Sequence, residues 1–197
     1  GRPLAAVARQ PVYMVAVLGG VVGYGMMMLV MTATPLAMEA CGFAFGDGAF
    51  VIQWHALGMF VPSFFTGHLI VRFGVVNVML AGTVLIAGCI GVNLAGITLV
   101  HFWLSLFLVG LGWNFLYIGS TSLLTESYRP EERAKAQGLN DSLVFGLVAV
   151  TTFSSGWLQS RFGWEAVNLA GVVPVAAVAV ALVWLRRQCL VRSSSPA

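Results

Sequence analysis

The chain has 197 residues, of which 59% are hydrophobic and only 9% charged, and its mean hydropathy is +0.91. Soluble domains carry about 25% charged residues, so these charged side chains are too few to cover a surface that faces water. This composition excludes a soluble enzyme, a nucleic-acid-binding domain and a disordered chain.

Long stretches without Asp, Glu, Lys or Arg predict an all-α membrane protein. A helix needs about 20 apolar residues to cross the hydrocarbon core, and it satisfies its own backbone hydrogen bonds there. Because residues 73–125 are long enough for two helices, the uncharged stretches hold six in all. Pro35 and Pro62 are expected to kink the first two helices, because proline donates no backbone hydrogen bond. The predicted helices span residues 12–37, 48–71, 75–95, 99–125, 140–160 and 165–186.

The basic residues predict how these helices are oriented. Lys and Arg favour the cytoplasmic side of a membrane, and nine of the 10 fall on one side of the predicted topology, with only Arg161 on the other. We therefore expect the chain in the cell (inner) membrane with both termini in the cytoplasm. The expected parts are a cytoplasmic linker at 1–10, a six-helix bundle at 11–187 and a cytoplasmic tail at 188–197.

A short motif occurs twice. Residues 67–74 read GHLIVRFG and residues 156–163 read GWLQSRFG, so both fit G-x-L-x-x-R-F-G. The first copy closes the second predicted helix and the second copy closes the fifth, on opposite faces of the membrane. Internal repeats of opposite orientation are typical of secondary transporters, so we predict two inverted repeats of three helices. A chance match is the alternative, because Arg-Phe-Gly is a simple way to end a helix.

The first copy of the motif resembles the major facilitator superfamily signature G-x-x-x-D-R-x-G-R-R. Gly67, Arg72 and Gly74 match it, whereas valines stand at the acidic position and at both trailing basic positions. Residues 126–141 (ESYRPEERAKAQGLND) are similar to the family's cytoplasmic loop between helices ten and eleven. The resemblance covers about residues 12–187. It implies the C-terminal six-helix half of a twelve-helix transporter, which moves a small molecule by alternating access, with the N-terminal half as its missing partner.

Polar side chains at membrane depth are expensive and tend to face a cavity or another helix. The resemblance implies that the first and fourth helices of each half line the central cavity. Tyr24, Asn114 and Tyr117 would then contact the substrate, and the last two share one helical face. Gln53 and His55, near the outer end of the second helix, complete the candidate substrate-binding residues. Because these side chains carry no fixed charge, they favour a neutral, amphipathic or aromatic substrate.

Helix packing is the alternative for each of these residues. An intramembrane asparagine often bonds only a neighbouring helix. A histidine side chain ordinarily titrates near neutral pH. A role for His55 in proton coupling is therefore one interpretation, and helix packing or a place at the entrance is the other. No carboxylate lies deep in any predicted helix, and a proton-driven carrier would hold its main acid in the missing half. Import and export are equally compatible with the sequence.

Charges at the cytoplasmic helix ends predict a latch. Arg72 ends the second helix and Glu126 ends the fourth on the same side, so an ion pair would tie the two ends when a gate is shut. Surface pairs contribute about 0–1 kcal/mol, which is enough to shift two states of similar energy. The alternative is that these charges only set the topology. Arg129, Glu132, Arg133 and Asp141 could extend this network. The candidate gating and structural residues are Gly67, Arg72, Gly74, Glu126, Arg129, Arg133 and Asp141.

Other classes of membrane protein fit less well. A rhomboid-type protease needs G-x-S-G and a later histidine, but residues 119–122 (GSTS) lack the last glycine and no histidine follows His101. No pore-helix signature or charged ring indicates a channel. The main alternative is a self-contained six-helix carrier, or a non-transporting scaffold, that acts as a homo-oligomer. Cys41, Cys89 and Cys189 form no C-x-x-C pair, so neither a metal site nor a cofactor is predicted.

Overall fold

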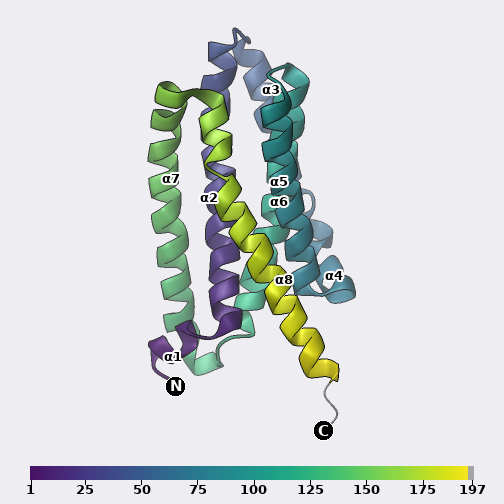
Figure 1. Cartoon of the computed structure of the whole chain (residues 1–197), viewed down its shortest axis with the longest axis vertical. Coiled ribbons are helices and arrows are strands. Elements are labelled where there is room, and N and C mark those ends of the chain that lie inside the picture. The colour runs from purple at the N-terminus through teal and green to yellow at the C-terminus, as the bar shows by residue number, and fades with distance from the viewer. Residues whose placement is uncertain (195–197) are drawn as a thin grey trace.

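A computed structural model describes the backbone of residues 1–194 and the surroundings of side chains as far as Gln188. This part of the chain is a bundle of helices without a strand, which confirms the predicted all-α class (Figure 1). The longer helices run roughly along the longest axis of the molecule. The elements are α1 (Leu4–Ala8), α2 (Pro11–Ala40), α3 (Phe45–Phe60), α4 (Ser63–Phe73), α5 (Val75–Ala95), α6 (Leu99–Thr125), the 3-10 turn η1 (Pro130–Glu132), α7 (Arg133–Leu169) and α8 (Val172–Ser194).

The second predicted helix is two helices. The kink predicted at Pro62 is confirmed, because the helix predicted over 48–71 is divided into α3 and α4, which are bent by 43° at residues 61–62. Pro62 explains the break, since it has no N–H for the carbonyl four residues before it. By contrast, α2 continues through Pro35 as one helix. α5 and α6 begin and end at the residues predicted for the third and fourth helices.

The last two predicted helices are joined at a sharp turn. α7 begins at Arg133, before the predicted start at 140, because the polar residues that open it are good helix formers. Gly163, with φ 80° and ψ −178°, interrupts α7, and the chain turns back there so that α8 runs beside α2 (Figure 1). α8 continues to Ser194, so most of the predicted tail is helical, and the rest of it (195–197) lies outside the described residues.

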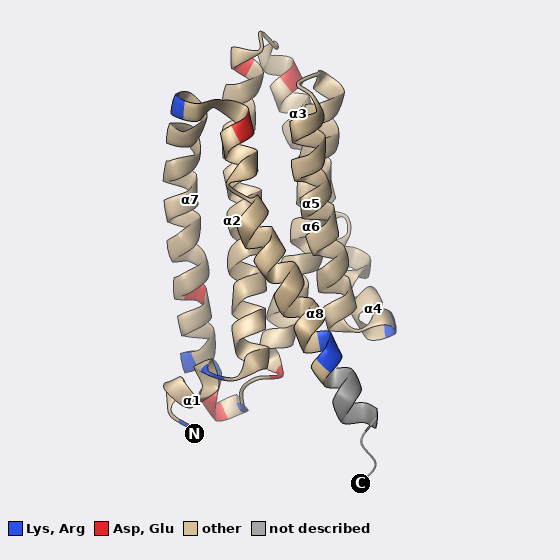
Figure 2. Ribbon diagram, viewed as in Figure 1, with Lys and Arg blue, Asp and Glu red and all other residues tan. Residues whose placement is uncertain are grey.

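Length and composition make the described chain a multi-pass membrane protein. Four helical runs are long and apolar enough to cross a membrane, and a fifth is added when α3 and α4 are taken as one bent span. Charged side chains gather toward the two ends of the bundle and leave a long uncharged middle (Figure 2). The four runs are Pro11–Ala40, Val75–Ala95, Leu99–Thr125 and Pro130–Gln188.

Glycines bring α5 and α6 into close contact. A Cβ on Gly82 would lie 2.8 Å from the carbonyl oxygen of Gly112, and a Cβ on Gly112 would lie 2.8 Å from that of Gly82. Small residues let helix backbones approach in this way. α6 packs in turn against α2, and α2 packs against α7. These contacts set the relative positions of α2, α6 and α7.

Both copies of the repeated motif end on a glycine with the same φ. Gly74 has φ 83° and Gly163 has φ 80°, in the left-handed region that disfavours residues with a Cβ. Gly74 follows the last residue of α4, and Gly163 interrupts α7. The two copies therefore end a helical run by the same backbone conformation.

We expect Gly74→Ala and Gly163→Ala each to lower the free energy of unfolding by about 1–2 kcal/mol, because alanine is strained at positive φ. A Cβ would meet nothing within 4 Å at either position, so crowding adds nothing to the strain. Gly67→Ala is the matched control, since its Cβ is equally free inside a helix, where alanine is favoured. Denaturant unfolding in detergent micelles measures all three, and an equal loss at Gly67 contradicts the argument.

Candidate functional site

Four aromatic rings from three helices meet around Tyr24. The ring centroid of Tyr24, in α2, lies 5.6 Å from Trp113 and 5.2 Å from Tyr117 of α6, and 5.9 Å from Phe145 of α7. Trp113 and Tyr117 stack at 5.4 Å with 11° between their planes. Edge-to-face and offset-stacked pairs of this kind are the preferred aromatic geometries. We call these four residues the aromatic cluster.

The aromatic cluster is open on one side and uncharged. Tyr24 and Tyr117 are half-buried, and Phe145 is 53% exposed. The structure thus brings together two of the predicted substrate residues. Trp113 and Phe145 were not among them, although the i, i+4 spacing of Trp113 and Tyr117 already places both on one helical face. No sequence signal pairs Phe145 with Tyr24, because that contact depends on how α7 packs on α2.

Asn114 contacts the bend between α3 and α4. Its side chain is fully buried, at 0% exposure. Nδ2 donates to the Met59 carbonyl oxygen at 2.6 Å and to Ser63 Oγ at 2.7 Å, and Thr66 Oγ1 donates to Oδ1 at 2.6 Å. Both N–H groups of the Asn114 amide therefore donate hydrogen bonds next to Pro62, whose backbone nitrogen has no hydrogen to donate. In this conformation Asn114 binds another helix, and contact with a substrate stays a prediction.

His55 lies at the contact between α3 and α6. It is 1% exposed, and its Nδ1 is 2.8 Å from the carbonyl oxygen of Leu106. Because a carbonyl oxygen only accepts, we assign the proton to Nδ1. A Cβ on Gly110 would lie 2.7 Å from the His55 carbonyl oxygen, so the two helices are close here. This position agrees with the packing alternative, and a role in proton coupling is untested.

Gln53 is exposed at the far end of the bundle from residues 1–10. It lines a pocket of about 710 Å³ between the end of α2 and the start of α3, together with Glu39 and mainly apolar side chains. Pro35, on the wall of this pocket, is about three turns of α2 away from Tyr24. The structure therefore does not bring Gln53 together with the aromatic cluster.

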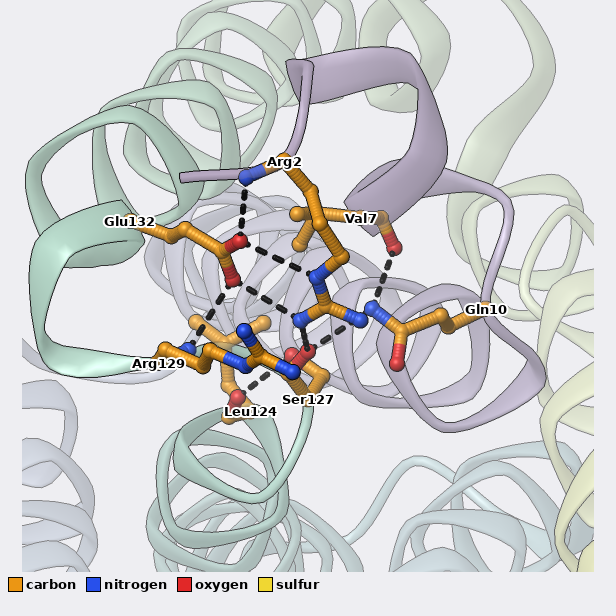
Figure 3. A network of polar contacts seen from close by, with 7 residues as sticks. All are labelled: Arg2, Val7, Gln10, Leu124, Ser127, Arg129 and Glu132. Carbon is orange, nitrogen blue, oxygen red and sulfur yellow. Dashed lines mark hydrogen bonds and ion pairs between the residues drawn. The ribbon is translucent and has the colours of Figure 1, made fainter.

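The predicted ion pair between Arg72 and Glu126 is not formed, which corrects that expectation. Both side chains are exposed, and the Arg72 guanidinium lies 5.3 Å from the ring centroid of Phe73. The 43° bend between α3 and α4 sets the direction in which α4 carries Arg72. Within the described side chains, the ion pair is instead Arg2–Glu132, at 2.8 Å (Figure 3).

The other candidate gating residues make few contacts. Arg129, Arg133 and Asp141 are exposed, and none forms an ion pair among the described side chains. Arg129 donates its backbone N–H to Glu132 Oε2 at 3.0 Å, and Arg133 Nε lies 3.5 Å from Gln137 Oε1. Across the described residues, no three His, Cys, Asp or Glu side chains are grouped so that they could hold a metal ion.

Comparison with known proteins identifies a family and several relatives that are similar to this chain. Residues 15–195 match the Major Facilitator Superfamily. The riboflavin transporter RfnT of Brucella anthropi is 45% identical over 183 residues, which are 93% of this chain and 46% of that protein. The uncharacterized MFS-type transporter YdeG of Bacillus subtilis is 33% identical over 162 residues, or 81% of this chain and 38% of the relative. The probable galactarate/D-glucarate transporter GudP of Bacillus subtilis is 27% identical over 131 residues, or 66% and 24%.

The chain spans less than half the length of each of these relatives. No solved structure matches it. The family match covers nearly all of the bundle, which confirms the predicted resemblance, and the relatives above are named as transporters. The chain belongs to the Major Facilitator Superfamily.

Proposed function

We propose that the chain is the C-terminal half of a secondary carrier for riboflavin or a closely related planar, neutral heteroaromatic compound. The observation that carries this proposal is the aromatic cluster, in which α2, α6 and α7 meet through ring contacts of 5.2–5.9 Å around Tyr24. A flat heteroaromatic ring system binds such a surface by stacking, worth about 0.5–1.5 kcal/mol for each aromatic pair. The relative RfnT, named as a riboflavin transporter, supports the substrate at 45% identity.

The proposed carrier has six spans in this chain. Four come from the long apolar runs and one from α3 with α4. The sixth follows if Gly163, with its φ of 80°, divides the run Pro130–Gln188 into two antiparallel spans. Matching glycine endings at Gly74 and Gly163 support two inverted repeats of three spans. The remaining spans of the carrier would lie in an N-terminal half that contacts the open side of the aromatic cluster.

We place the carrier in the cell (inner) membrane, with residues 1–10 and the end of α8 in the cytoplasm. Nine of the 10 basic residues follow that assignment, as the preference of Lys and Arg for the cytoplasmic side requires. The pocket at Gln53 then opens to the outside and forms the outer mouth of the pathway. Residues 1–10 are the linker from the N-terminal half.

Each predicted substrate residue receives a role in this proposal. Tyr24 and Tyr117 contact the ring system, and Gln53 contacts the substrate at the outer mouth. Asn114 and His55 hold α3 against α6 and so keep the wall of the pathway in place. No coupling acid is assigned to this chain, because none of its carboxylates belongs to the aromatic cluster.

A sugar diacid is the second substrate class, since GudP is named for galactarate and glucarate. A diacid needs cationic partners at membrane depth, where an unpaired carboxylate is expensive. The aromatic cluster contains no cation, and no Lys or Arg occurs between residues 73 and 128. This chain therefore favours the neutral aromatic compound.

Counterflow tests the proposal without assuming a direction or a coupling ion. The full-length protein in proteoliposomes preloaded with unlabelled riboflavin should accumulate radiolabelled riboflavin transiently, and galactarate should not compete. Empty liposomes and liposomes preloaded with galactarate are the controls. Correctly folded protein that gives no riboflavin exchange, or that exchanges galactarate instead, contradicts the proposed substrate.

A further inference from the structure

Residues 1–10 are fastened to the segment between α6 and α7 through one carboxylate (Figure 3). Glu132 Oε1 accepts hydrogen bonds from the backbone N–H of Arg2 at 2.7 Å and from Arg2 Nε at 3.0 Å. Glu132 Oε2 accepts from Arg2 Nη2 at 2.8 Å and from the backbone N–H of Arg129 at 3.0 Å. Most of these bonds come from Arg2, and the fork of its guanidinium fixes the direction of approach.

Glu132 is buried by this contact, with 2% of its side chain exposed. The hydrogen bonds from Arg2, and after them the one from Arg129, hold the pKa of the Glu132 carboxyl far below its usual value. The same contact raises the pKa of the Arg2 guanidinium. Without Arg2, the buried Glu132 carboxylate would keep only the hydrogen bond from the backbone N–H of Arg129. The segment between α6 and α7 would then have to rearrange so that water reaches the carboxylate.

Neighbouring contacts extend the fastening to three helices. Gln10 Nε2, just before α2, donates to the Ser127 carbonyl oxygen at 2.7 Å, beyond the end of α6, and Arg2 Nη2 reaches the same oxygen at 3.3 Å. Tyr13 OH, in the first turn of α2, donates to the Ala136 carbonyl oxygen of α7 at 2.8 Å. The ends of α2, α6 and α7 are thus joined at one place, and these are the helices that carry the aromatic cluster.

A groove lies between α2 and α7 close to this contact. It has a volume of about 470 Å³ and an apolar lining that includes Tyr13, Val17, Leu139 and Leu143. Tyr13 belongs both to the groove and to the fastened end. Separation of α2 from α7 at this end would therefore widen the groove toward the aromatic cluster.

We propose that the Arg2–Glu132 contact is a conformational clamp, which holds the ends of α2, α6 and α7 together and opens when this end of the carrier separates. The inference rests on the proposed function only for its place in a transport cycle. A closed clamp keeps the aromatic cluster shut off from the side of residues 1–10. An open clamp exposes it to that side.

Thiol labelling of the groove tests the clamp in the full-length protein without substrate. Cys41, Cys89 and Cys189 are replaced, and Leu139→Cys, half-buried in the groove, is the reporter. Glu132→Gln should raise the rate of maleimide labelling roughly five- to tenfold, which is the low end of a typical coupling between states.

The controls separate the clamp from a general loss of acidic charge at this end. Glu131→Gln, which removes the exposed carboxylate next to Glu132, should leave the labelling rate unchanged. The reversed pair, Arg2→Glu with Glu132→Arg, should bring the rate back toward that of the unaltered protein. An unchanged rate in folded Glu132→Gln overturns the clamp. If Glu132→Gln does not fold, Arg2→Gln is used in its place. A higher labelling rate in Arg2→Gln then supports the clamp, and an unchanged rate overturns it.

The clamp should stay closed between pH 5 and pH 8. Because the pKa of Glu132 is lowered in the folded protein, the contact is complete above the usual carboxyl pKa of 4.5 and is lost only as the pH falls through the lowered value. Between pH 5 and pH 8, the rate at which maleimide labels the cysteine at position 139 should therefore change only as the reactivity of a free thiol changes. An added rise toward pH 5 would contradict the clamp. Since no substrate is present, either result leaves the riboflavin proposal to its own test.

Discussion

Replacing Asn114 with leucine is expected to lower the free energy of unfolding by about 2 kcal/mol. Leucine fills a similar volume but removes the hydrogen bonds to the Met59 carbonyl oxygen, Ser63 and Thr66, all at 2.6–2.7 Å. A side-chain bond between membrane helices is worth about 0.6–1 kcal/mol, and a buried acceptor left unpaired costs about 1–3 kcal/mol. The loss should be measured by equilibrium unfolding in mixed micelles.

Asn77→Leu is the matched control for this change. Asn77 is exposed at the start of α5 and donates only to the carbonyl oxygen of Phe73, four residues before it. Its replacement should alter the free energy of unfolding by about 0.5 kcal/mol or less. If both leucine variants lost the same stability, Asn114 would not hold the bend between α3 and α4.

Replacing Tyr24 with alanine should reduce riboflavin counterflow at least about tenfold. The change removes ring contacts to Trp113, Tyr117 and Phe145 together. A loss of about 1.4 kcal/mol in substrate binding, comparable to one good aromatic contact, corresponds to a factor of ten. Tyr24→Phe keeps the ring and should retain counterflow within about twofold.

Phe153→Ala controls for the loss of an aromatic ring as such. Phe153 lies in the same helix as Phe145, is 86% exposed and is outside the aromatic cluster. Its replacement should leave riboflavin counterflow close to that of the unaltered protein. Equal losses in Tyr24→Ala and Phe153→Ala would show that the aromatic cluster has no special part in transport.

The helical layout could be predicted where it depends on local sequence. α5 and α6 match their predicted bounds because short glycine-containing loops, ending at residue 74 and covering residues 96–98, separate the apolar runs. Gly74 and Gly163 were found as a repeat, and their positive φ values explain why glycine stands at both positions. Tyr24 and Tyr117 were placed on one cavity wall by resemblance to the family, and they lie in contact.

The contacts that depend on tertiary packing could not be predicted. Arg2 and Glu132 are 130 residues apart, and no pattern selects this pair over Arg72 and Glu126. The kink at Pro62 was predicted, but no local pattern indicates that Asn114 of α6 packs against it. Local patterns determined the helices, whereas side-chain partners followed from how those helices pack.

Protection of a single cysteine by substrate tests the central claim most directly. Phe145→Cys, at the open side of the aromatic cluster, and Phe153→Cys, outside it, are introduced into full-length protein without Cys41, Cys89 and Cys189. Saturating riboflavin should slow maleimide labelling at position 145 and leave position 153 unaffected. Equal labelling of position 145 with and without riboflavin, in protein that exchanges riboflavin, would show that the substrate binds elsewhere.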